Sequence, residues 1–103
     1  MNDLGFREKR SGYAAFEATV SGRVQHVGFR YYACVEADRL GILGWIRNDP
    51  NGNVAVHAEG EPENLEKFLS WLRKGPPHGK VDAVNVNRLP PDGTYKRFAV
   101  DYE

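Results

Sequence analysis

The segment LGWIRNDPNGNVAVHAEG, residues 43–60, decides the predicted fold of this chain. Its beginning, Leu43–Asn48, favours a strand, and residues 49–52 are all of types that favour a turn. From Val54 onward, apolar residues recur at every second position, which is the period of a half-buried strand. The segment therefore predicts a β-hairpin in the middle of the chain.

A helix is predicted on each side of this hairpin, because apolar residues there recur at spacings of three and four. The stripe before the hairpin consists of Phe29, Ala33, Ala37 and Leu40. The stripe after it consists of Leu65, Phe68, Leu69 and Leu72. Gly41 and Gly75 follow the two stripes, where glycine commonly ends a helix, and Pro62 suits the first turn of the second helix.

Strands are also predicted towards both ends of the chain. Before the first helix, Phe16, Ala18 and Val20 alternate with polar residues, and after the second helix residues 81–89 and 97–102 favour strands. The first two strands, joined through a helix, should run parallel with the third strand inserted between them, and each strand–helix–strand crossover should be right-handed. We therefore predict an α+β fold: a ferredoxin-like βαββαβ sandwich with an extra C-terminal strand, an antiparallel-type sheet and two helices on one face.

The length of 103 residues suits a single domain, which we predict to occupy residues 13–103. Residues 1–12 are predicted to be a flexible polar N-terminal extension, because they have no apolar periodicity. Fourteen basic residues balance fourteen acidic ones, which argues against sequence-blind binding of nucleic acid.

The cysteine content and the hydropathy of the sequence indicate a cellular location. Cys34 is the only cysteine, so an intramolecular disulfide is excluded. No apolar span of about 20 residues is present, and the start of the chain lacks the apolar region of a signal peptide. We therefore expect a cytoplasmic monomer that binds neither membranes nor nucleic acid.

Several features at one rim of the predicted sheet favour an anion. The loop of residues 22–28 leaves the first strand and Asn48 ends the second, so both should lie on the same rim, about 9–10 Å apart. The loop leads into a helix N-terminus, whose free amides and dipole attract anions, and Arg30 can hold two oxygens of one anion. These residues alone leave open both an anion site and a tight connection without a ligand.

Two motifs at this rim resemble the signatures of the acylphosphatases. Residues 20–30, Val-Ser-Gly-Arg-Val-Gln-His-Val-Gly-Phe-Arg, are similar to the first signature. Residues 44–48, Gly-Trp-Ile-Arg-Asn, followed by Gly52, Val54 and Gly60, are similar to the second, and the resemblance extends over about residues 13–102. It implies hydrolysis of small acyl phosphates to a carboxylate and inorganic phosphate, with phosphate also as inhibitor and with no metal or other cofactor.

The resemblance also implies a role for each matching residue. Arg30 is similar to the phosphate-binding arginine of the family, and Asn48 to the asparagine that orients the attacking water. The predicted phosphate-binding loop is formed by the backbone amides of Arg23, Val24, Gln25, His26 and Val27. Here His26 replaces a glycine of the family pattern, and Ile46 replaces a smaller residue. Since histidine is among the few non-glycine residues enriched at positive φ, the loop can keep its shape.

Two other functions are compatible with a ferredoxin-like fold. One is a module that binds phosphate or carbamoyl phosphate with weak or no turnover. The other is an RNA-binding domain, for which the third strand lacks the stacking aromatics. Elsewhere, we expect His57 to be an exposed histidine on the sheet face, and Cys34 to pack beside the core. An acidic stretch is expected to be a solvated face: Glu59, Glu61, Glu63 and Glu66.

Overall fold

The computed structural model describes residues 11–102 and contains two helices and five strands in these residues. Most of the predicted extension, residues 1–12, lies outside the described residues. In chain order the elements are β1 (Ala14–Arg23), α2 (Phe29–Leu40), β2 (Leu43–Asn48), β3 (Val54–Gly60), α3 (Pro62–Lys74), β4 (Lys80–Leu89) and β5 (Phe98–Val100). No helix within residues 11–102 is long and apolar enough to cross a membrane.

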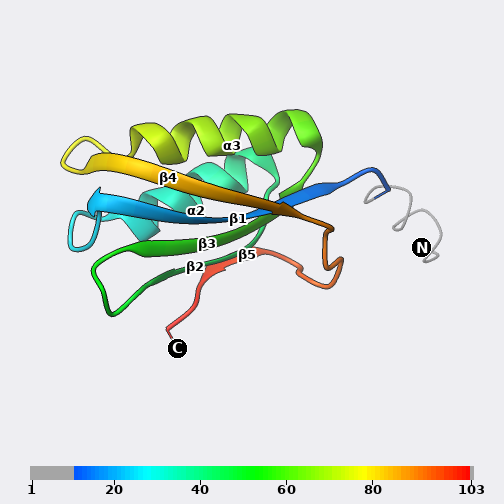
Figure 1. Cartoon of the computed structure of the whole chain (residues 1–103). Helices are drawn as coiled ribbons and strands as arrows, with labels where there is room; N and C mark the ends of the chain where they lie inside the picture. Colours follow the sequence, from blue (N-terminus) through cyan, green and yellow to red (C-terminus); the bar gives the residue numbers. More distant parts are fainter. Residues whose placement is uncertain (1–10, 103) are drawn as a thin grey trace.

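The strands form one sheet in the order β4-β1-β3-β2-β5. Strand β3 is antiparallel to both β1 and β2, so β1 and β2 run parallel with β3 between them, as predicted. Both helices lie on one face of the sheet (Figure 1). The extra strand β5 pairs in parallel with β2 and is shorter than predicted, because only Gly44, Trp45 and Ile46 have partners on it. The sheet is therefore mixed, and the predicted α+β ferredoxin-like fold is confirmed.

The core lies between the sheet and the two helices. Both predicted helical stripes are buried, from Phe29 to Leu40 in α2 and from Leu65 to Leu72 in α3. They pack against the inward side chains of the strands, among them Phe16, Val20 and Ile46. Since burying one large apolar side chain contributes about 1.5–3 kcal/mol, this two-layer core is the main source of stability.

The open face of the sheet holds a buried polar cluster, which corrects two sequence predictions. His57 is 4% exposed and Glu59 is 1% exposed, whereas both were expected to face solvent. The Nδ1 atom of His57 lies 2.9 Å from Oε2 of Glu17, and its Nε2 atom lies 2.6 Å from Oε2 of Glu59. Of the predicted acidic face, Glu61, Glu63 and Glu66 are exposed as expected.

The connection between β4 and β5 is the physical reason for this burial. The backbone amides of Asp92 and Gly93 donate to the Glu59 carboxylate, at 2.6 Å and 3.1 Å. The ring of Tyr95 from the same connection lies 5.1 Å from the His57 ring, between centroids. The alternation of residues 54–59 places His57 and Glu59 on the open face correctly, but it cannot show that a distant loop covers that face.

Candidate active site

The ends of β1 and β2 lie on the same rim of the sheet, as predicted. Val20 of β1 and Asn48 of β2 are both register partners of Val54 on the strand between them. The chain leaves β1 just beyond this row and enters α2 through residues 24–28. The topology therefore brings the loop, the helix N-terminus and Asn48 together.

A cavity of about 310 Å³ opens at this rim. It is lined by Val24, His26, Gly28, Phe29, Arg30, Tyr31, Cys34, Asn48, Val100 and Tyr102. The structure thus brings together Arg30, Asn48 and His26 of the predicted site. Arg23, Gln25 and Val27 are not in the lining, but their predicted contribution comes from the backbone of the loop rather than from their side chains.

Asn48 carries an unused hydrogen-bond acceptor at this cavity. Its Oδ1 atom is buried and has no hydrogen-bond partner within the part of the chain that the structure describes. A buried polar atom without a partner costs about 1–3 kcal/mol, so such atoms usually face a ligand or a water. Asn48 also lines the cavity, so its carboxamide, which has both a donor and an acceptor, lies next to the place where a ligand or a water would bind.

Arg30 supplies the positive charge of the cavity. It lies in the first turn of α2. The helix dipole disfavours a positive side chain there, but the dipole and the free backbone amides both favour a bound anion. Its guanidinium pairs with no carboxylate within residues 11–102 and lies over the Tyr102 ring, 5.6 Å from the centroid. An unpaired guanidinium next to a helix N-terminus can bind two oxygens of a phosphoryl group.

The loop before α2 is fixed by a side chain whose role the sequence analysis missed. The Gln25 Nε2 atom donates to the backbone oxygens of Asp49 and Asn53, at 2.8 Å and 2.9 Å. These oxygens flank the turn between β2 and β3, directly after Asn48. Gln25 is therefore a positioning residue that links the loop to the strand carrying Asn48. Val24, 1% exposed, anchors the other part of the loop in the core.

Two residues of the loop adopt the left-handed conformation. His26 has a φ of 64° and is the only non-glycine residue with positive φ among residues 11–102, and Gly28 has a φ of 77°. This confirms that His26 takes the backbone conformation for which a glycine is usually needed. A turn containing left-handed residues directs successive amides into one concave surface, which binds anions. The loop therefore keeps a left-handed residue at the position where the family pattern has glycine.

Cys34 lies in the wall of the cavity and packs against the core, as predicted. Burial raises the pKa of its thiol, the nearby Asp38 carboxylate raises it further, and Arg30 partly offsets the rise. The thiol is therefore protonated at neutral pH and is not a nucleophile. The thiol is thus set apart from the other polar residues in the lining, which include Arg30, Asn48 and His26.

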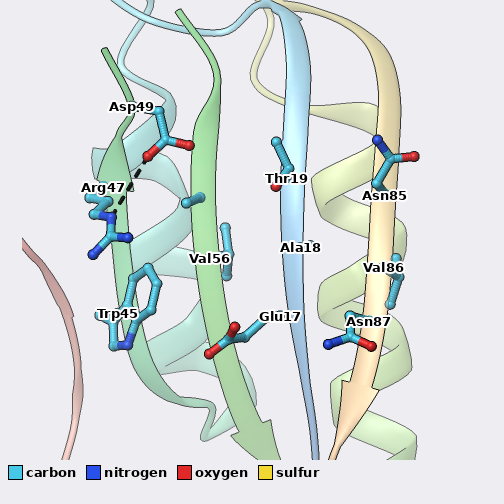
Figure 2. A pocket seen from close by; sticks show the side chains of 11 residues that line it. Glu17, Ala18, Thr19, Trp45, Arg47, Asp49, Val56, Asn85, Val86 and Asn87 are labelled. Atoms are coloured by element: carbon cyan, nitrogen blue, oxygen red, sulfur yellow. Dashed lines mark ion pairs between the residues drawn. The ribbon is translucent and has the colours of Figure 1, made fainter. Parts of the chain in front are cut away.

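A second hollow, of about 410 Å³, lies on the open face of the sheet (Figure 2). Figure 2 shows Trp45, Arg47 and Asp49 on one side of it and Asn85 and Asn87 on the other. Arg47 is paired with Asp49 at 3.7 Å and with Asp101 at 3.5 Å, so its charge is neutralised. The smaller cavity at the rim is therefore the better candidate for an anion.

The chain is thus a small α+β protein with a cavity next to the N-terminus of its first helix. Residues 16–100 match the acylphosphatase family. A relative from Nocardioides sp., named acylphosphatase, is 51% identical over 81 residues, which cover 79% of this chain and 78% of the relative. The acylphosphatase structures from Bacillus subtilis and Coxiella burnetii each superpose with a TM-score of 0.83, at 35% and 34% identity. These two alignments cover 86% and 91% of this chain, and 99% and 98% of the two structures.

The chain belongs to the acylphosphatase family. It is a hydrolase whose substrates are acyl phosphates and whose product is inorganic phosphate. The predicted family and activity are thus confirmed.

Proposed function

We propose that the cavity at the rim is where this chain hydrolyses the carboxyl–phosphate bond, with Arg30 and Asn48 in different roles. Arg30 and the backbone amides of residues 23–27 bind the phosphoryl group, and Asn48 orients the attacking water. The observation that carries this proposal is that Asn48, whose buried Oδ1 atom has no hydrogen-bond partner among residues 11–102, lines the same cavity as Arg30. One polar group thus remains free for a water while the others bind the anion.

The proposed reaction needs few groups because the leaving group is a carboxylate. Its conjugate acid has a pKa of about 4, so it departs without a proton from the protein. The bond between phosphorus and the acyl oxygen breaks with its electron pair on the carboxylate, while the water oxygen bonds to phosphorus. The proton lost by the water ends on a phosphoryl oxygen. Arg30 and the amides stabilise the negative charge on the phosphoryl oxygens.

Asn48 contributes by position rather than by proton transfer. A carboxamide cannot act as a base near neutral pH, but its oxygen accepts a hydrogen bond and fixes the direction of the water's lone pairs. Holding a water in line with the phosphorus atom removes much of the entropic cost of the attack. The turn contacts of Gln25 keep this arrangement fixed relative to the loop.

The proposed mechanism predicts that hydrolysis is independent of metal ions. In it, Arg30 and the loop amides supply the positive charge that a divalent cation supplies in many phosphoryl-transfer enzymes. Phosphate release from acetyl phosphate should therefore proceed at the same rate with and without excess EDTA. A loss of activity in EDTA that is restored by a divalent cation would contradict this mechanism.

We further propose that the protein is a cytoplasmic monomer that binds no nucleic acid and is inhibited by its product, phosphate. The single cysteine and the equal numbers of basic and acidic residues support the location and the lack of a nucleic-acid partner. Sedimentation at a mass near 11.6 kDa is expected for the monomer. A larger species at micromolar concentration would contradict the proposed assembly.

A further inference from the structure

The buried polar cluster on the open face of the sheet has no part in the proposed hydrolysis. It consists of Glu17 on β1 and of His57 and Glu59 on β3, and it lies outside the cavity at the rim. His57 and Glu59 are almost completely buried, whereas the Glu17 side chain is 46% exposed. Since charged groups are rarely buried unless they are paired, the cluster needs an explanation of its own.

Both ring nitrogens of His57 face carboxylate oxygens. The Nδ1 atom lies 2.9 Å from Oε2 of Glu17, and the Nε2 atom lies 2.6 Å from Oε2 of Glu59. An ionised carboxylate only accepts hydrogen bonds, and a neutral imidazole has a single N–H group. Two such hydrogen bonds at once require two N–H groups, which the ring has only as an imidazolium.

Glu59 is also bound by the connection between β4 and β5, residues 90–97. Its Oε2 atom accepts from the amide of Asp92 at 2.6 Å, and its Oε1 atom accepts from the amide of Gly93 at 3.1 Å. Both oxygens thus serve as acceptors, which fits an ionised carboxylate. Because one carboxylate binds both the His57 ring and the connection, the proton on the ring and the position of the connection are linked.

The connection depends on such contacts because it has no helix or strand of its own. The Tyr95 ring packs on the His57 ring, with centroids 5.1 Å apart. On β2, the Trp45 ring stacks on the same imidazole, with centroids 6.0 Å apart. The Asp92 carboxylate is engaged within the connection, where it accepts from the Thr94 hydroxyl. The imidazole is therefore enclosed between the sheet and the connection.

The nearby groups of β2 and β4 do not supply a second positive charge to the cluster. Arg47 on β2 pairs with Asp49 and Asp101. On β4, the register partner of Glu17 is Asn87, which is uncharged. Within the described residues, the two carboxylates of the cluster thus share one positive charge, that of the imidazolium.

We propose that Glu17, His57 and Glu59 form a proton-dependent latch, which holds the connection between β4 and β5 on the open face while His57 is an imidazolium. When the ring loses one proton, one nitrogen presents a lone pair to a carboxylate, and a charge-assisted hydrogen bond is lost. The latch stabilises the folded chain while the ring keeps both protons. This contribution is lost as the pH rises through the titration of the ring.

NMR of the unmodified, ¹⁵N-labelled protein tests the charge and the link directly. At about pH 6, both ring nitrogens of His57 should carry a proton, and on raising the pH to about 9 one of them should lose it. The backbone amide signals of Asp92 and Gly93 should shift with the same midpoint as the ring. The Gly41 amide, which donates at the end of α2, is the control and should not follow this midpoint. An unprotonated ring nitrogen at the lower pH, or amides that do not follow the ring, would overturn the latch.

Urea unfolding at the same two pH values measures what the latch contributes. Between them, the equilibrium constant for unfolding should rise by about 10-fold or more in the unmodified protein relative to His57→Gln, because only the former loses a hydrogen bond to a charged group. His78→Gln is the matched control, since His78 is an exposed histidine outside the cluster, and it should keep the pH dependence of the unmodified protein. Equal pH dependence in the unmodified protein and in His57→Gln would contradict the proposal. If His57→Gln does not fold, the NMR titration of the unmodified protein decides.

Discussion

Arg30→Ala is expected to lower kcat/KM for acetyl phosphate by about 10³-fold or more and to weaken inhibition by phosphate. Asn48→Ala is expected to lower kcat by about 10²-fold while inhibition by phosphate is largely kept. The difference follows from the two roles. The guanidinium contacts the phosphoryl oxygens in the substrate, in the transition state and in the product, whereas the carboxamide contacts only the water.

Steady-state kinetics with phosphate as a competitive inhibitor separate these effects. Matched controls are Arg73→Ala and Asn87→Ala, which remove the same side chains from exposed positions outside the cavity at the rim. Both should retain the kcat and the phosphate inhibition constant of the unmodified protein. If Asn48→Ala abolished phosphate inhibition but kept kcat, the two roles would have to be reassigned.

Arg30→Lys separates the effect of the positive charge from that of the planar guanidinium. A lysine keeps the charge but loses the planar pair of donors that can bind two phosphoryl oxygens. We therefore expect this variant to lie between the unmodified protein and Arg30→Ala, both in kcat/KM and in phosphate inhibition. The same measurements check this order.

Local periodicity was sufficient to predict the elements and the rim of the site. The spacing of the apolar residues within 29–40 and 62–72 depends only on which face of each helix is buried. In both helices the predicted face is the buried one. Strands β1 and β2 are joined through a helix and run parallel, so their C-terminal ends share a rim, and the sequence alone could place Asn48 and the loop there. The left-handed conformation of His26 could be predicted from its residue type and from the glycine it replaces.

Contacts between segments distant in the chain were not predictable in this way. The burial of Glu59 depends on amides from Asp92 and Gly93, and the loop position depends on Gln25 reaching the turn after Asn48. Periodicity describes the direction of a side chain relative to its own element, but not which loop meets it. The tyrosines in the lining of the cavity were not predicted for the same reason, because Tyr31 and Tyr102 lie far apart in the chain.

Gly44, the second residue of strand β2, lies at a position where the structure has no room for a side chain. A Cβ atom on Gly44 would lie 1.9 Å from the backbone oxygen of His57 on β3, and the φ of Gly44 is 138°. On the other side, its amide donates to the Arg97 oxygen at 3.0 Å. A shift that relieved the clash would disturb the pairing of β2 with β3 or break the hydrogen bond between Gly44 and Arg97.

Gly44→Ala is therefore expected to destabilise the domain by about 4 kcal/mol or more, which is a large part of the roughly 5–15 kcal/mol that stabilises a typical domain. Gly41→Ala is the matched control, because Gly41 also has positive φ, 69°, but no atom within 4 Å of its Cβ position. The control should lose only the conformational term, about 1–2 kcal/mol. Urea unfolding at equilibrium measures both values. Equal losses in the two variants would show that β2 and β3 can separate to admit a methyl group.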